Sequence, residues 1–308
     1  MLDSITPLAA STVALAIPLV LAALGELVVE RSGVLNLGLE GMMLLGALAS
    51  FAAVAHGGGL APAVLAAMAA GMIAALSFGF ITLTLQANQV AAGLSLTILG
   101  AGVSAFLGRQ YVGFRAPASF EDLPIPLLSS IPLVGPSLFS MNLLGYATLA
   151  LLGATAWFLY RTRAGLALRS IGESPVVARS LGLHVNRVRY CAVAFGGAMA
   201  GLAGCYYAVA QFKMWQEGLT SGNGWIALAL VVFATWRPLR VAFGALLFGG
   251  VSALGLYLQA IGVQVSVFAL ASLPYIATVV VLVLISADQQ MIRRHAPASL
   301  GKPFHDDS

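Results

Sequence analysis

The chain has 308 residues, of which 60% are hydrophobic and only 8% are charged, and its formal net charge is +4. Soluble domains carry about 25% charged residues, so the composition excludes a soluble enzyme, a nucleic-acid-binding protein and a disordered protein. It predicts instead a membrane protein that forms a single transmembrane domain over residues 1–308, with the lipid bilayer and no nucleic acid as its partner.

Nine apolar segments are long enough to cross a bilayer as helices, which takes about 20 mostly apolar residues each. They are continuous apolar runs rather than alternating ten-residue segments, so we expect an all-α polytopic protein and not a barrel. The seventh segment is short and follows Ser221-Gly222-Asn223, which predicts a broken or half helix there. In chain order the segments cover residues 8–29, 34–55, 62–85, 90–110, 141–160, 190–212, 224–236, 241–262 and 266–287.

Basic residues are distributed unevenly between the two sides of this nine-span arrangement. All of them lie on one side except Arg109, Arg115 and Lys213. Because cytoplasmic loops carry an excess of Lys and Arg, the loop 161–189 and a C-terminal tail over 288–308 are predicted to be cytoplasmic. The N-terminus is then outside.

Two polar residues, Asn36 and Glu40, stand at the start of the second span. Buried charges in a membrane are costly unless they are paired or face a cavity. Glu40 therefore has two interpretations. It is an interfacial partner for Arg31, or it is a group that shapes the translocation pathway or its gate.

Further polar residues lie around the fourth span. Asn88 and Gln89 precede it, and Ser95 and Thr97 lie within it. Turn chemistry and hydrogen bonds between helices explain such residues. The alternative is a pathway wall that offers exchangeable hydrogen bonds to a passing solute. Asn223 joins this group of candidate pathway residues because the ends of half helices point their dipoles toward such a pathway.

The sixth span carries a run of small residues. Gly197 with Gly201, and Ala200 with Gly204, have the four-residue spacing that lets two helices approach closely. We interpret the run as a packing surface rather than a substrate contact.

The loop 161–189 contains the signals of a short helix. Ser174 is a suitable N-cap, Pro175 fits the first helical position, and Gly182 fits a left-handed C-cap. A helix over 175–181 is marginal alone, so its apolar surface must pack on something. It either lies on the bilayer, with the arginines of the loop pairing with anionic headgroups, or docks a cytoplasmic partner. Its apolar residues are Val176, Val177, Ala178 and Leu181.

Motifs for ATP hydrolysis and for common catalytic chemistry are missing. The chain has no phosphate-binding loop and only two lysines, Lys213 and Lys302, and it has no HExxH, GxSxG or CxxC pattern. We therefore expect a transport subunit and not an enzyme, with no catalytic residue, no bound cofactor and no metal.

The short-helix region resembles a known family. The pattern Gly172-Glu-Ser-Pro-Val-Val-Ala-Arg-Ser-Leu-Gly182, followed by Val185-Asn-Arg187 and the glycine run 196–204, resembles permeases of ABC importers that serve branched-chain amino acids, ribose-type sugars and nucleosides. Residues 30–43 and 224–249 are similar to the nucleoside branch. Within that branch the chain looks most like the shorter, guanosine-type permease subunit.

The resemblance implies a vitamin-B12-importer-like permease fold in a bacterial inner membrane, moving nucleosides inward by alternating access. It implies three partners: a second permease subunit in a heterodimer, a cytoplasmic ATPase that uses the ATP, and an extracytoplasmic substrate-binding protein or lipoprotein. Sugars, branched-chain amino acids or another small polar solute are the alternative cargo, and a stand-alone channel or secondary transporter is the alternative mechanism. In the family the loop 161–189 carries the coupling helix that docks on the ATPase. The residues placed there are Glu173, Ser174, Pro175, Val176, Val177, Ala178, Arg179, Leu181 and Gly182.

Overall fold

The computed structural model describes residues 2–131, 134–262, 266–286 and 295–304. In this part of the chain the regular structure is helical, and extended pairing is limited to isolated bridges such as that between Val112 and Trp215. The predicted all-α architecture is therefore confirmed for the described residues.

Twelve α-helices follow one another along the described chain. α3 and α9 continue as π-helix over Phe80–Thr84 and Tyr206–Gln211, and α4 ends in the 3₁₀ turn Arg109–Tyr111. The helices are α1 Leu2–Arg31, α2 Leu39–Ala55, α3 Leu60–Gly79, α4 Gln89–Gly108, α5 Val134–Leu138, α6 Leu143–Arg161, α7 Arg163–Glu173, α8 Pro175–Ser180, α9 Val185–Cys205, α10 Asn223–Phe233, α11 Pro238–Ala260 and α12 Val267–Ser286.

Every predicted span overlaps one of these helices. Within the described residues, six helices are long and apolar enough to cross a membrane alone, namely α1, α3, α4, α6, α9 and α11 with their short extensions. The second and seventh spans form shorter apolar helices, α2 and α10, and the half-helix expectation for the seventh agrees with the 11 residues of α10. α2 starts at Leu39 rather than near residue 34, because the Asn36 side chain accepts a hydrogen bond from the Gly38 N–H (2.9 Å) and holds a turn there. Nine complete crossings and their orientation remain predictions.

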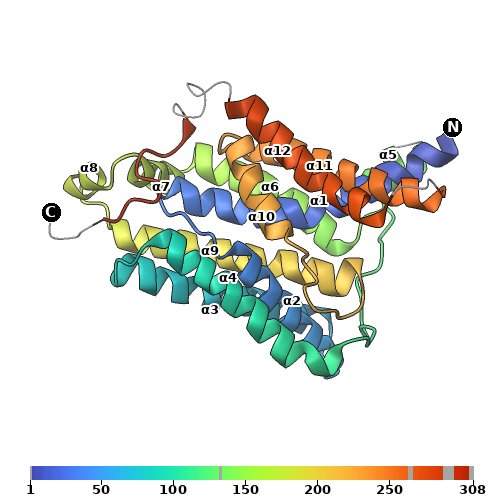
Figure 1. The fold of residues 1–308 in the computed structure, drawn as a ribbon. Coiled ribbons are helices and arrows are strands. Elements are labelled where there is room, and N and C mark those ends of the chain that lie inside the picture. The colour runs from blue at the N-terminus through green and yellow to red at the C-terminus, as the bar shows by residue number, and fades with distance from the viewer. Residues whose placement is uncertain (1, 132–133, 263–265, 287–294, 305–308) are drawn as a thin grey trace.

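α9 lies at the centre of the bundle, packed on α1, α2 and α3 (Figure 1). α11 and α12 form one flank, and α3 and α4 form the other. The close approach depends on the glycine run: a Cβ added at Gly201 would meet the carbonyl oxygen of Ala67, and one at Gly204 would meet that of Met43. The interpretation of this run as a packing surface is confirmed.

Segments that the distribution of basic residues placed on one side lie together in space. The Arg31 side chain at the end of α1 donates hydrogen bonds to the backbone carbonyls of Trp236 (3.0 Å) and His295 (3.2 Å). Near the opposite end, Arg115 pairs with Met214 through an isolated bridge. Figure 1 shows α7 and α8 at one end of the molecule and the start of α1 at the other. Which compartment each end faces stays a prediction.

Two segments are more ordered than the sequence indicated. The loop 161–189 contains an additional helix, α7, which Thr162 caps by accepting the Gly165 N–H (3.0 Å) and which buries Leu168 and Ile171. In the predicted tail 288–308, residues 295–304 pack against the bundle end, while Arg293 and Arg294 lie outside the described residues.

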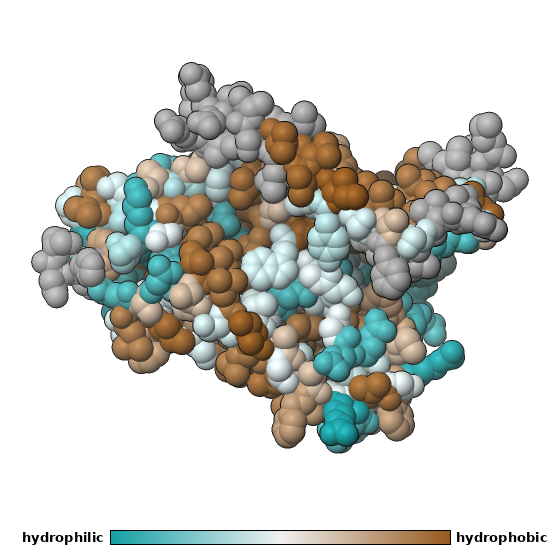
Figure 2. Space-filling model, in the orientation of Figure 1, coloured by the Kyte–Doolittle hydropathy of each residue, from teal (hydrophilic) through white to brown (hydrophobic). Residues whose placement is uncertain are grey.

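The outer surface of the bundle is apolar, as a lipid-facing surface must be. Ile98, Phe106 and Phe243 are 74%, 78% and 73% exposed. Figure 2 shows hydrophobic surface along the flank of α11 and α12, with hydrophilic residues gathered toward the ends.

Candidate functional site

The short helix α8 forms where its capping signals predicted. The Ser174 hydroxyl accepts the Val177 N–H (3.4 Å), and Pro175 occupies the first turn. Gly182 has φ +83°, and its N–H donates to the carbonyl of Arg179 (2.8 Å). A left-handed residue at this position ends a helix and satisfies its last carbonyls. The predicted helix 175–181 is confirmed as Pro175–Ser180.

α8 exposes most of its apolar side chains. Val176, Val177 and Leu181 are 55%, 56% and 75% exposed, and Glu173 and Arg179 are exposed beside them. Exposed apolar side chains flanked by charged ones are typical of an interaction surface. Ala178 differs, because it is buried in a small cluster with Ile171, Val185 and Phe304.

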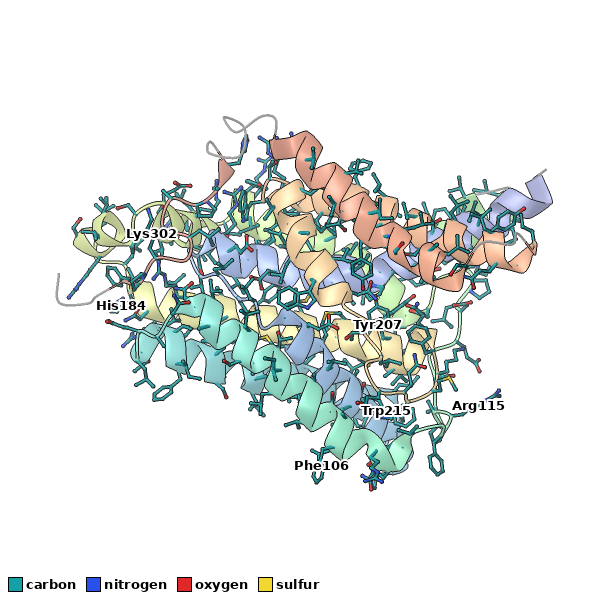
Figure 3. The ribbon with its side chains drawn as sticks, viewed as in Figure 1. Phe106, Arg115, His184, Tyr207, Trp215 and Lys302 are labelled. Atoms are coloured by element: carbon teal, nitrogen blue, oxygen red, sulfur yellow. The ribbon has the colours of Figure 1, made fainter. Side chains whose placement is uncertain are left out.

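A groove of about 430 Å³ separates α8 from α7. Arg169 and Glu173 contribute charge to it, while Val177 and Leu181 contribute apolar surface. α7 and α8 therefore present a mixed concave surface at the end of the molecule where His184 and Lys302 are also found (Figure 3). The full lining is Arg31, Leu166, Arg169, Ser170, Glu173, Ser174, Val177, Ala178 and Leu181.

Glu40 occupies a second polar site, inside the bundle. It lies in the first turn of α2 and is 7% exposed. Its carboxylate accepts the backbone N–H groups of Gly222 (2.9 Å) and Gly224 (2.6 Å) and the hydroxyl of Thr220. The N-terminus of a helix carries unsatisfied N–H groups and partial positive charge, so Glu40 serves as a cap for α10. This differs from the Arg31 partnership considered above, because Arg31 donates instead to the backbone carbonyls of Trp236 and His295.

Three other candidate pathway residues support the connection between α1 and α2. Asn36 is fully buried, and its N–H donates to the Glu26 carboxylate (3.2 Å). Gln89 accepts the N–H of Leu35 (2.8 Å), and the Thr97 hydroxyl donates to the carbonyl of Leu37 (2.9 Å). These hydrogen bonds hold α4 against residues 35–37.

The remaining candidates have local partners. Asn88 caps α4 by accepting the Ala91 N–H (3.0 Å), and the Ser95 hydroxyl donates to the carbonyl of that same residue (2.8 Å). Asn223 donates to the carbonyl of Thr220 (2.7 Å) just before α10. The structure thus brings Glu40 and Asn223 to one junction. It leaves Asn88 exposed at the N-cap of α4 and Ser95 exposed within α4. A pathway role for any of them stays a prediction.

Sequence reasoning missed a buried contact around Trp236. Its indole N–H donates to the Glu30 carboxylate (2.5 Å), and Trp236 is only 2% exposed. Thr235 and Trp236 both have positive φ, +48° and +53°, which non-glycine residues seldom adopt. The adjacent charges Glu30 and Arg31 at the end of an apolar helix are the sequence signal that could have indicated a buried partner.

Comparison with known proteins gives consistent matches over nearly the whole chain. Residues 8–287 match the family described as branched-chain amino acid transport system / permease component. A putative glucose ABC transporter permease protein of Haloferax volcanii is 37% identical over 96% of each chain. The guanosine ABC transporter permease protein of Bacillus subtilis is 34% identical over 96% of this chain and 95% of its own. A nucleoside ABC transporter permease protein of Lactococcus lactis is 30% identical over 87% and 88%.

Proposed function

We propose a nucleoside-importing role for this chain, which belongs to the family of permease components of branched-chain amino acid transport systems. Members of this family are transport components rather than enzymes, and the chain is a multi-pass protein of the cell membrane. The proposal is that it forms the membrane pathway of an ATP-driven importer working by alternating access.

The short helix α8 carries the proposal of ATP coupling. Val176, Val177 and Leu181 stand exposed on a capped helix at the end where the basic segments gather. A cytoplasmic ATPase that binds this surface with different affinity in its ATP-bound and ATP-free states would shift the equilibrium between the inward-facing and outward-facing forms of the permease. Glu173 and Arg179 are the proposed polar contacts, and ATP is hydrolysed by the partner.

The Glu40 junction is the proposed link between two moving parts of the pathway. Among the helices that the structure describes, α2 and α10 are apolar but shorter than a full span, and the Glu40 carboxylate on α2 joins it to the N-terminus of α10. A movement of α2 would therefore carry α10 with it. A second permease subunit in a heterodimer would complete the pathway, and a substrate-binding protein or lipoprotein would deliver the cargo.

Nucleosides are the proposed cargo because two relatives at 34% and 30% identity are named as guanosine and nucleoside permeases. A sugar is the second candidate, and one observation favours it: the Haloferax volcanii relative, at 37% identity, is named as a putative glucose permease.

Reconstituted vesicles provide the test. The permease is combined with its partner permease, ATPase and binding protein, and uptake of labelled guanosine, adenosine and glucose is measured with ATP or a non-hydrolysable analogue. We expect nucleoside uptake only with ATP. If only glucose is taken up, the cargo is a sugar and the nucleoside proposal is wrong. Equal uptake without the ATPase would refute ATP coupling.

The docking role of α8 has its own test. Leu181→Arg should abolish copurification of the ATPase, because it places a charge in the apolar contact surface. Leu127→Arg is the matched control, since Leu127 is 87% exposed in the connector before α5. Equal ATPase recovery from both variants would exclude α8 as the docking surface.

A further inference from the structure

The C-terminal segment 295–304 is joined to the end of α7 through Ser299. The Ser299 N–H and hydroxyl both donate to the carbonyl of Gly172, at 3.0 and 2.7 Å, and Ser299 is 5% exposed. Gly172 is itself packed closely against the backbone of Arg31, the last residue of α1. Ser299 therefore holds the chain just ahead of Pro175, where α8 begins.

Phe304 packs beneath α8. It is 7% exposed and forms a buried cluster with Ile171, Ala178 and Val185. These three residues come from α7, α8 and α9 respectively. Since Ala178 is the buried residue of α8, the packing of this short helix on the protein depends on the cluster that Phe304 completes.

Arg189 of α9 connects this segment to the transmembrane helices. Its side chain is 1% exposed, and its guanidinium donates to the carbonyl of Ser32 (3.1 Å) and to the hydroxyl of Ser299 (3.3 Å). The guanidinium also lies over the Phe304 ring, 5.8 Å from its centroid, a distance at which cation and ring attract. Nearby, the Gly301 N–H donates to the carbonyl of Gly33 (3.2 Å).

We infer that residues 295–304, which Arg189 holds through Ser299 and Phe304, position α8 and transmit its movement to α1 and α9. This rests on the proposed function, in which α8 docks the ATPase. The physical reason is that a six-residue helix is not stable alone and cannot pass on a force unless it is held. Phe304 packs against the buried side of α8, and Ser299 bonds to Gly172 in the last turn of α7, just before α8. Arg189 links both residues to Ser32, in the loop that follows α1.

The test uses the complete transporter and a set of single substitutions. Phe304→Ala removes the ring beneath α8, Ser299→Ala removes the hydroxyl hydrogen bonds, and Phe304→Leu keeps apolar volume. Lys302→Ala is the matched control, because this side chain is exposed in the same segment. Hydrogen exchange at the amides of residues 176–183 is measured on the permease, and ATP hydrolysed per solute imported is measured on the complex.

Opening of α8 should become about tenfold more frequent in Phe304→Ala, and its amide exchange correspondingly faster. More ATP should then be hydrolysed per solute imported in Phe304→Ala and Ser299→Ala, while Phe304→Leu recovers most of the coupling and Lys302→Ala matches wild type. A role in folding alone would lower the yield of complex without changing the ATP-to-solute ratio, and that result would overturn the inference.

Failure of this inference is distinguishable from failure of the proposed function. If wild-type permease neither binds an ATPase nor imports a solute with ATP, the proposed function fails. If wild type imports normally, but Phe304→Ala leaves both exchange at 176–183 and the ATP-to-solute ratio unchanged, the positioning role is wrong and the proposed function stands.

Discussion

Replacing Glu40 by alanine should destabilise the junction between α2 and α10 by at least about 2 kcal/mol, since two of the donors that lose their acceptor, those of Thr220 and Gly224, are buried and each costs about 1–3 kcal/mol. Three donors lose their acceptor: the N–H groups of Gly222 and Gly224 and the hydroxyl of Thr220. Glu40→Gln keeps one carbonyl oxygen, so we expect roughly half of that loss.

The assay compares thermal unfolding of the purified permease with hydrogen exchange in residues 220–226. Glu217→Ala and Glu217→Gln are the matched controls, because Glu217 is an exposed carboxylate in the same connection before α10. A double-mutant cycle with Thr220→Val isolates the side-chain pair, and its coupling energy should be clearly non-zero. If Glu40→Ala unfolds at the same temperature as Glu217→Ala and exchange at 220–226 is unchanged, the capping argument is refuted.

Gly182→Pro should leave the permease inserted but uncouple ATP hydrolysis from uptake, because proline cannot adopt the positive φ found there; wild-type uptake in this variant would contradict the coupling assignment. Gly201→Leu should prevent folding, because the α3 backbone fills the space at Gly201. Gly153→Leu is the control and should fold normally, because the space around Gly153 is open. The two variants are compared by the yield of detergent-solubilised protein. Trp236→Phe should lower stability by about 1–3 kcal/mol through loss of the indole hydrogen bond to a buried carboxylate, and Trp157→Phe, 63% exposed, should have no effect in the same melting experiment.

Parts of this structure could be predicted from the sequence because they depend on interactions between neighbouring residues. Ser174, Pro175 and Gly182 act on their immediate neighbours, so the ends of α8 followed from residue type alone. The same holds for the apolar helices, because lipid requires each spanning segment to be both apolar and internally hydrogen-bonded.

The polar contacts could not be obtained in this way, because their partners lie far apart in the chain. Glu40 bonds to residues about 180 positions later, and the sequence offered the nearer Arg31 as a partner. Arg187 and Arg189 both fall in the predicted basic loop 161–189. Two positions apart on a helix they face different directions, and only Arg189 is buried.

The sequence by itself therefore determined the membrane class, the helical segments, the capped helix α8 and the close packing of α9, since each depends on composition, periodicity or adjacent residues. Only the tertiary structure decided that Glu40 caps α10, that Trp236 pairs with Glu30, and that Phe304 packs against Ala178 of α8. These features depend on which helices the fold brings together. The partner of a buried polar group is known only once both groups have been placed in three dimensions.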